Sequence, residues 1–378
     1  MSENKVGTVI IGGGIGGVCL AYYLAELGEA DILVVEGREL ASGCTGGSMG
    51  GVRQQFSTAN EVELALRGRR FWQTFEGVFD YPCAYYQDGY LMLTGREELF
   101  EQLGRAAEVQ RAGGAPNVEM VAAADLHHIV PWLSSEGLIG GSWTPDDGRV
   151  NPTDGVYGVA AAARRLGVKF KQHTRVAKIE RSRGGWTLHT PDPIQARRVI
   201  VAAGLGSPDL MRPLGLDLPI TPMMVHYGFT TPVIQDERLP MTIDLDTGFC
   251  VEREQDAAVV TILASDVPDN YGVDDMLTEF AEAAAVRAPI FTEVSIRSTI
   301  SAAADATGGD GHPWIGEYEP GLWTMTGFDG HGTMQGPAIA KFTANLIAGI
   351  PDSVLDPAVF DPHRVPAGTE EWLRASRR

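Results

Sequence analysis

The feature that most constrains the fold is an apolar run at residues 9–11 that passes into closely spaced glycines. Residues 18–27 follow with apolar side chains at helical spacing, so a buried strand, a tight turn and a helix are predicted. Gly12, Gly14 and Gly17 match the pattern G-x-G-x-x-G, which permits the turn, brings backbone close to a pyrophosphate and lets the helix pack on the strand. This stretch therefore predicts a dinucleotide site.

Two neighbouring features support that prediction. The free N–H groups at a helix start, here near Ile15, attract phosphate, and the helix dipole favours negative charge there. Residues 32–35 are typical of a second strand, and they end in Glu36, whose carboxylate is placed to accept hydrogen bonds from an adenosine ribose. Gly37 and Arg38 follow this carboxylate directly, and we include them in the candidate cofactor site.

The length and composition exclude several classes of protein. A chain of 378 residues exceeds the usual size of a single core, so two domains are expected. The net charge of −19 argues against nucleic acid or an anionic membrane as a partner, and no apolar run approaches the roughly 20 residues that cross a bilayer. The four cysteines are far apart and the glycine pattern begins almost at once, so we expect a cytoplasmic protein with no signal peptide and no metal site.

The segment 37–53 is dominated by glycine and hydroxyl side chains, which do not form a hydrophobic core. Because it directly follows the second strand, we expect it to run close along a bound ligand, with a flexible loop as the alternative. Two later segments, 198–206 and 322–336, repeat the passage from a strand into glycines, the second before a helix at 337–346. The candidate ligand contacts in segments 37–53 and 198–206 are Thr45, Gly47, Ser48, Gly50, Arg53, Ala203, Gly204 and Gly206.

The whole pattern predicts an α/β protein with a Rossmann-type domain and a second, substrate domain built on an antiparallel sheet. Strands at 223–231, 242–251, 257–264 and near 292–300, with a helix at 273–288, belong to the second domain. Other helices are expected at 61–79, 97–112 and 151–166, and other strands at 140–143, 168–170, 175–181 and 186–190. The expected boundaries are 1–80, 145–215 and 305–378 for the cofactor domain and 81–144 and 216–304 for the substrate domain, with the tail after Pro357 as a surface extension.

Three of these features together resemble the D-amino-acid-oxidase-type flavoprotein family, which includes sarcosine oxidases, glycine oxidase and related amine dehydrogenases. They are residues 12–36, 199–206 and 327–336, so the resemblance runs along nearly the whole chain. The stretch Gly-Phe-Asp-Gly-His-Gly at 327–332 and the loop at 45–56, which ends in Gly-Gly-Val-Arg-Gln-Gln-Phe, are similar to the sarcosine oxidase β-subunit branch.

The resemblance implies FAD as the cofactor, with the adenine near Val176, the ribose at Glu36 and the isoalloxazine between residues 45–53 and 330–334. A flavin that is being reduced gains electron density at N1 and O2, so a helix N-terminus or a positive group nearby stabilises it. The residues implied at this end of the flavin are Gly330, His331, Gly332, Thr333 and Met334.

The sequence departs from the family where flavin is attached covalently. Monomeric sarcosine oxidases use a cysteine in the strand before the final cofactor segment, and residues 301–305 contain none. Other relatives use a histidine in the early loop, and none stands near Gly46 and Gly47. We therefore expect non-covalent FAD, although Cys44 lies close to the loop position in sequence.

A second departure concerns the carboxylate of an amino-acid substrate. Family members commonly bind it with an arginine near the position of Asp305 or a lysine near Met334, and neither an aspartate nor a thioether binds an anion. Asp305 and Glu252 either receive a cationic group of the substrate or are solvated surface acids, and we expect the second. If the substrate is a simple amino acid, an arginine from elsewhere must bind its carboxylate, and the candidates are Arg53, Arg253 and Arg297. The alternative is a substrate that is not a simple amino acid.

Three residues are candidates for catalysis: Arg53, His331 and His226. Arg53 either lies near flavin N5 or the substrate, or is a structural arginine in a salt bridge. His331, between two glycines in a predicted turn, either lines the pocket or is a buried histidine bonded to backbone. His226 precedes Tyr227 on an apolar strand, from which it either reaches the open face of the flavin or packs in the core.

The predicted reaction is the oxidation of a C–N bond of a small amine or N-substituted amino acid to an imine, by hydride transfer to flavin N5. O2 or another electron acceptor then takes the electrons. The lysine that assists oxygen in monomeric sarcosine oxidase has no counterpart that we can place, so the acceptor stays open. One alternative is an amine dehydrogenase or a subunit of a larger complex that passes electrons to a partner. Two others are a FAD-binding subunit with an inactive substrate face and a flavin monooxygenase that a nicotinamide reduces.

Overall fold

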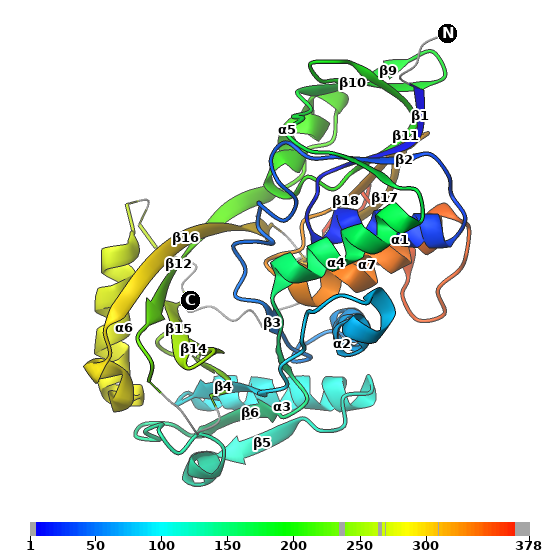
Figure 1. Cartoon of the computed structure of the whole chain (residues 1–378). Helices are drawn as coiled ribbons and strands as arrows, with labels where there is room; N and C mark the ends of the chain where they lie inside the picture. The colour runs from blue at the N-terminus through cyan, green and yellow to red at the C-terminus, as the bar shows by residue number, and fades with distance from the viewer. Residues whose placement is uncertain (1–4, 234–238, 264–266, 269, 309, 367–378) are drawn as a thin grey trace.

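The protein is built on two large sheets, with a group of helices beside the first (Figure 1). The computed structural model describes residues 5–233, 239–263, 267–268, 270–308 and 310–366. The predicted α/β class, with one parallel and one largely antiparallel sheet, is confirmed. The predicted domain boundaries stay a prediction.

The first sheet contains the N-terminal strand at its centre, in the order β17-β18-β11-β1-β2-β8. Five of these strands are parallel, β17 is antiparallel at one edge, and the hairpin of β9 and β10 pairs antiparallel with β11. The carboxyl ends of the parallel strands therefore meet at one edge. The bounds are β1 (Lys5–Ile11), β2 (Ile32–Val35), β8 (Lys169–Lys171), β9 (Lys178–Ser182), β10 (Gly185–His189), β11 (Ile194–Val201), β17 (Trp314–Glu319) and β18 (Leu322–Thr326).

Helices pack beside this sheet in contact with one another (Figure 1). Helix α1 (Ile15–Glu26) lies between α4 (Pro152–Arg165) and α7 (Gly332–Ile347), and α7 also contacts α2 (Ala59–Phe79). Small and apolar residues run almost all round α1, which suits a helix that is covered on several sides. Short helices follow β11 at η2 (Gly204–Gly206), α5 (Ser207–Met211) and η3 (Arg212–Leu214).

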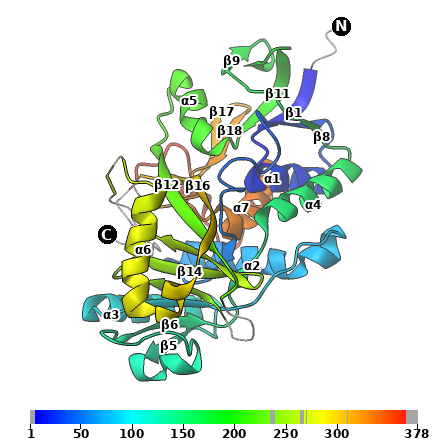
Figure 2. The same ribbon diagram turned by 60° about the vertical axis from the view of Figure 1, so that its left-hand side comes forward.

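The second sheet has the order β16-β12-β15-β14-β13-β4-β6-β5, and its neighbouring strands are antiparallel except for the parallel pair of β4 and β13. Helix α6 (Val273–Arg287) packs on one face of it, and α3 (Glu97–Ala112) lies along β4 and β6 (Figure 2). The bounds are β4 (Tyr90–Thr94), β5 (Glu119–Ala122), β6 (Gly140–Thr144), β12 (Ile220–Thr230), β13 (Met241–Asp244), β14 (Phe249–Glu254), β15 (Ala257–Ile262) and β16 (Ile296–Thr307). Smaller elements are the ribbon of β3 (Gly51–Val52) and β7 (Gly148–Arg149), and the short helices η1 (Ala123–His128), η4 (Pro289–Glu293) and η5 (Pro357–Val359).

Several predicted elements have different limits in the structure. The predicted strand 242–251 is a hairpin of β13 and β14, because Gly248 has a φ of +78° in the turn that joins them. The strand predicted near 292–300 runs to Thr307, since β16 pairs with β12 along its whole length. The last helix begins at Gly332 and not at Pro337, so Pro337 lies inside it.

The prediction that the tail after Pro357 is a surface extension is wrong for its described part. Phe360 is fully buried, and its carbonyl accepts a hydrogen bond from the N–H of Ile315 at 2.7 Å. Arg364 pairs with Asp310 through two hydrogen bonds of 2.8 and 3.1 Å. The tail therefore packs on β17 through Phe360, while Val365 is exposed; its last twelve residues, 367–378, lie outside the described ranges.

Candidate functional site

A cavity of about 1620 Å³ lies at the carboxyl edge of the parallel sheet and extends to β12 and β16 of the second sheet. Ligands of open α/β sheets bind at this edge, because the loops that follow the strands leave a crevice there. Every residue of the predicted cofactor site except Gly50 lines this cavity, as do the catalytic candidates Arg53, His226 and His331. Gly50 packs instead against Val150, whose carbonyl oxygen a Cβ at position 50 would approach to 2.0 Å.

At one end of the cavity the wall is formed by glycine backbone. Gly12 has a φ of +118°, and a Cβ there would lie 2.2 Å from the carbonyl oxygen of Ala202. A Cβ on Gly17 would lie 2.1 Å from the carbonyl oxygen of Gly12. These two glycines therefore let α1 and β11 approach the turn as closely as they do, and the start of α1 stays open to the cavity.

Glu36 lies at the same end, at the carboxyl end of β2. One oxygen of its carboxylate accepts a hydrogen bond from the N–H of Gly13 at 2.7 Å, and the other accepts from the N–H of Arg38 at 2.8 Å. These contacts hold the carboxylate at the cavity wall, and each oxygen keeps a further lone pair for a ribose hydroxyl. The arrangement fits the adenosine half of a dinucleotide.

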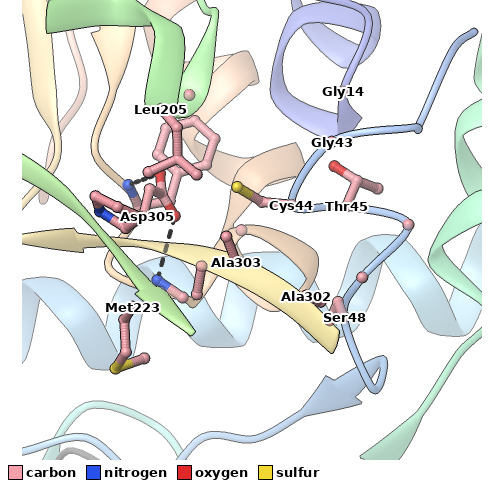
Figure 3. Close-up of a pocket in the computed structure, with 18 of the residues that line it drawn as sticks. Gly14, Gly43, Cys44, Thr45, Ser48, Leu205, Met223, Ala302, Ala303 and Asp305 are labelled. Carbon is pink, nitrogen blue, oxygen red and sulfur yellow. Dashed lines mark hydrogen bonds between the residues drawn. The ribbon is translucent and has the colours of Figure 1, made fainter. Parts of the chain in front are cut away.

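The segment 42–49 runs along the cavity. Figure 3 shows Cys44, Thr45 and Ser48 on this segment, close to Ala302 on β16. Thr45 accepts a hydrogen bond through Oγ1 from the N–H of Ile15 at 3.1 Å, so the segment also caps the start of α1. A Cβ on Gly47 would lie 2.5 Å from the Cβ of Ala302, which explains why a glycine stands where the segment passes the strand.

The N-terminus of α7 lines the cavity beside this segment, where Oγ1 of Thr333 donates a hydrogen bond of 2.9 Å to Oγ of Ser48. Gly332, Thr333 and Met334 all line the cavity, and the first N–H groups of a helix have no acceptor within that helix. The sequence predicts these residues just before a helix, whereas they form its first turn. The positive end of the helix dipole therefore faces the cavity and favours negative charge on a ligand there.

Arg53 and His331 contact each other beside this helix start. Arg53 is 1% exposed, its guanidinium lies 4.1 Å from the ring centroid of Phe56, and it donates a hydrogen bond to the carbonyl of Gln55. Its NH2 lies 3.3 Å from Nε2 of His331. Because arginine only donates, Nε2 of His331 is the acceptor in this contact. Both side chains line the cavity, and they bring one fixed positive charge to it.

Both ring nitrogens of His226 are engaged. Nε2 lies 3.2 Å from the carbonyl oxygen of Tyr271, which can only accept, and Nδ1 lies 2.7 Å from Oγ of Ser301. The ring therefore joins β12 to β16 and to the segment before α6. This favours a positioning role for His226 over proton transfer, although the residue does line the cavity.

The prediction that Asp305 is a surface acid is wrong. The side chain is 6% exposed at the end of β16, and its carboxylate accepts hydrogen bonds from the N–H groups of Phe328 at 2.9 Å and Gly330 at 3.4 Å (Figure 3). Burial raises the pKa of Asp305, and these hydrogen bonds oppose the shift. The carboxylate thus holds the turn that leads into α7. A prediction that ends β16 at residue 300 leaves it outside the strand and hides this role.

The same prediction is wrong for Glu252, which is 3% exposed on β14. Burial raises its pKa to about 8, so the carboxyl group keeps a proton at neutral pH. Burial likewise raises the pKa of Asp147 to about 7, although hydrogen bonds from the side chain and backbone of Gln54 lower it. Asp147 directly precedes β7 and Glu252 lies on β14, and neither side chain lines the cavity.

Sequence reasoning missed most of the apolar and aromatic wall on the second sheet; of its members it named Tyr227, beside His226. Tyr90, Met241, Leu263 and Tyr227 line the cavity there. Burial raises the pKa of both tyrosines, so their hydroxyls remain protonated and can donate hydrogen bonds. The strands that carry these residues come from distant parts of the chain, and no local pattern shows which of their faces meets the cofactor edge. By contrast, the proposed alternative arginines lie elsewhere: Arg297 is exposed on β16, and Arg253 donates to the carbonyl of Gln255.

In the ranges that the structure describes, no group of three or more histidine, cysteine, aspartate or glutamate side chains is arranged to hold a metal ion. No helix within those ranges combines the length and the apolar character needed to cross a bilayer. The cytoplasmic location stays a prediction.

Comparison with known proteins gives a consistent result. A family model described as FAD dependent oxidoreductase matches residues 8–346. The chain is 24% identical over 390 residues to mitochondrial dimethylglycine dehydrogenase of Rattus norvegicus, which covers 96% of this chain but 45% of that protein. It is 24% identical over 364 residues to glycine oxidase of Bacillus licheniformis, covering 92% of this chain and 95% of that one. Among solved structures, L-proline dehydrogenase from P. horikoshii matches with a TM-score of 0.88 and 26% identity, covering 96% of this chain and 98% of that chain.

Proposed function

Because the chain belongs to the FAD dependent oxidoreductase family, we propose that it oxidises the C–N bond of a small secondary or tertiary amine or N-substituted amino acid to an imine. The observation that carries this proposal is the cavity. Its glycine-lined end fits a dinucleotide, its other end is lined by tyrosine, methionine and leucine side chains, and the start of α7 lies between the two. The named relatives act on amines or amino acids, which supports the substrate class.

FAD, held without a covalent bond, supplies the two-electron chemistry. The protein's share is to bind, orient and shield the reactants. In this proposal the glycines of the first βα turn and Glu36 hold the adenosine and pyrophosphate. The first turn of α7 stabilises negative charge at the far end of the cofactor, with His331 beside it.

Arg53 is proposed to bind or orient an acidic group of the substrate, because its charge reaches the cavity next to the second sheet. The hydroxyls of Tyr90 and Tyr227 add uncharged donors on the same wall. The walls of Met241 and Leu263 favour the neutral form of an amine, since an apolar environment disfavours the ammonium. A neutral amine has the free electron pair that the oxidation requires.

The test is an anaerobic screen of secondary amines, N-methyl amino acids and cyclic amino acids against the purified FAD-loaded protein. We expect at least one class to bleach the visible flavin band, while primary amines of the same size bleach it more slowly. A protein that holds FAD but is bleached by no amine would refute the proposed reaction and favour a FAD-binding subunit.

The electron acceptor is either O2 or another molecule. The named relatives include dehydrogenases and an oxidase, so their names do not distinguish the two. In the described part of the chain, no lysine lines the cavity to assist oxygen. We propose an acceptor other than O2, so that substrate bleaching should be rapid and reoxidation by air slow. Rapid oxygen consumption during turnover would establish an oxidase.

A further inference from the structure

Helix α2 contacts the first turn of α7 along one of its faces. The contacting residues are Glu61, Gly68 and Trp72, which stand seven and eleven positions apart on α2. At 3.6 residues per turn this spacing places all three on the same side of the helix. The contacts therefore form a single strip that faces α7.

Trp72 reaches the backbone of the turn itself. Its Nε1 donates a hydrogen bond of 2.8 Å to the carbonyl of Thr333, and both groups are buried. In a regular helix that carbonyl would accept from the N–H of residue 337, but Pro337 has none. The indole thus replaces the hydrogen bond that the proline removes, and it fixes the direction of a carbonyl in the turn that lines the cavity.

Gly68 allows α2 to lie against the next carbonyl of the same turn. A Cβ at this position would lie 1.6 Å from the carbonyl oxygen of Met334, a distance that no side chain can occupy. Glycine inside a helix lowers the stability of the helix by about 1 kcal/mol relative to alanine. Gly68 therefore weakens α2, but it allows this close approach.

Glu61 holds the side chain of the next residue of the turn. Its Oε2 accepts a hydrogen bond of 2.6 Å from Nε2 of Gln335, and its Oε1 lies 2.7 Å from Nδ1 of His312. All three side chains are buried. Three consecutive residues of α7, 333–335, are therefore each held by a different residue of α2.

The residues just before α2 also bring a positive charge to the cavity, that of Arg53. Arg53 stands six residues before the start of α2, and its contact with His331 ends at the residue that directly precedes α7. Phe56 packs edge-on against the ring of His331, with 4.9 Å between the ring centroids. One continuous stretch, 53–72, thus sets the distance between the guanidinium and the helix start.

We propose that Glu61, Gly68 and Trp72 are positioning residues that hold the first turn of α7 against the bound flavin and thereby set its reduction potential. The reduced flavin carries extra electron density at its pyrimidine end, so it is stabilised more than the oxidised form by the positive end of α7. The proposal rests on FAD occupying the cavity as proposed above, and it is independent of which amine is the substrate.

The test compares two glycines of the same helix. Gly68→Ala introduces a methyl group that must push α7 away, whereas a Cβ on Gly77 meets no atom within 4 Å. We expect Gly68→Ala to lower the midpoint potential of bound FAD by up to about 30 mV, equivalent to a tenfold loss in the equilibrium constant for two-electron reduction. Gly77→Ala should keep the potential of the parent and unfold at an equal or higher temperature.

Trp72→Phe is the second variant, because Gly68→Ala introduces a steric clash with α7 and so can fail to fold. It keeps an aromatic ring and loses the hydrogen bond to Thr333, and we expect the potential to fall by a smaller amount. Potentials are measured by dithionite titration with a reference dye, so no amine is needed. Potentials equal to the parent in folded, FAD-loaded Trp72→Phe would overturn the proposal, even if amine oxidation itself is established.

Discussion

The nucleotide end of the cavity is lined by backbone, whereas the substrate end is lined by side chains from separate strands. At the first end, glycines of one short stretch meet the neighbouring strand at distances that exclude any Cβ. At the second end, Tyr90, Met241 and Tyr227 come from β4, β13 and β12 and are brought together by the register of the second sheet. The backbone end has no room for an added side-chain atom, whereas substitutions at the side-chain end can change the chemical groups that face a ligand.

The largest effect is expected at the backbone end, from Gly17→Ala. The new methyl group would lie 2.1 Å from the carbonyl oxygen of Gly12, so the turn must open. We expect a loss of about 3 kcal/mol in the free energy of unfolding, as for an overpacked core, and the purified protein should be colourless.

The matched control for this change is Gly104→Ala in α3, where a Cβ meets nothing within 4 Å. This variant should bind FAD like the parent, and urea unfolding should show equal or slightly higher stability. A yellow, stable Gly17→Ala protein would show that the nucleotide end adapts as freely as the substrate end, and the comparison would fail.

This difference also explains how much the sequence could predict. The passage of strands into glycines, three times along the chain, predicted which segments line the cavity, since such contacts depend on backbone and on neighbours in sequence. The sequence alone predicts that Asp305 and Glu252 are surface acids, because their burial arises from strand pairing between distant segments, which no local pattern reveals. Tyr90 lies in a strand that is buried at every position, so no alternation marks the face that meets the cavity.

At the substrate end, Arg53→Ala should reduce kcat/KM by at least about 30-fold and retain FAD. Truncating a buried charged partner in a binding contact costs about 2 kcal/mol or more, which corresponds to this factor. The measurement is the rate of flavin reduction under anaerobic conditions at several substrate concentrations.

The control is Arg297→Ala, which removes an equal charge from an exposed position on β16. Its kinetics should match those of the parent. If Arg53→Ala loses FAD instead of slowing reduction, Arg53 belongs to the cofactor-holding side of the comparison and not to the substrate side.

A smaller, pH-dependent effect is expected from Glu252→Gln on the second sheet. Burial raises the pKa of this carboxyl group from 4.5 to about 8. Between these two pH values, the folded protein therefore keeps a proton on Glu252 that the unfolded chain has released. The parent should therefore lose stability as the pH rises from about 5 to 8, by up to 1.4 kcal/mol for each unit of pKa shift. Glutamine carries no such proton, and its advantage in melting temperature over the parent should grow across this range.

Glu254→Gln on the same strand controls for the loss of one negative charge, because its side chain is partly exposed. Its effect on the melting temperature should change less between pH 5 and pH 8. A Glu252→Gln advantage that is constant or shrinks with rising pH would show that this carboxyl group is ionised in the folded protein.

The smallest effect is expected from Cys44→Ser, although Cys44 lines the cavity at the boundary between the two ends. Burial and, to a smaller extent, the nearby carboxylate of Asp305 raise the pKa of this thiol to about 11. The thiol is therefore protonated at neutral pH and is a poor nucleophile toward flavin.

Acid precipitation of either protein should leave a colourless pellet and a yellow supernatant, with FAD affinity changed by less than about threefold, since a serine keeps the size and a donor. A yellow pellet from the parent that becomes colourless in Cys44→Ser would instead identify a covalent bond at Cys44, and the side-chain end would then hold the cofactor as firmly as the backbone end does.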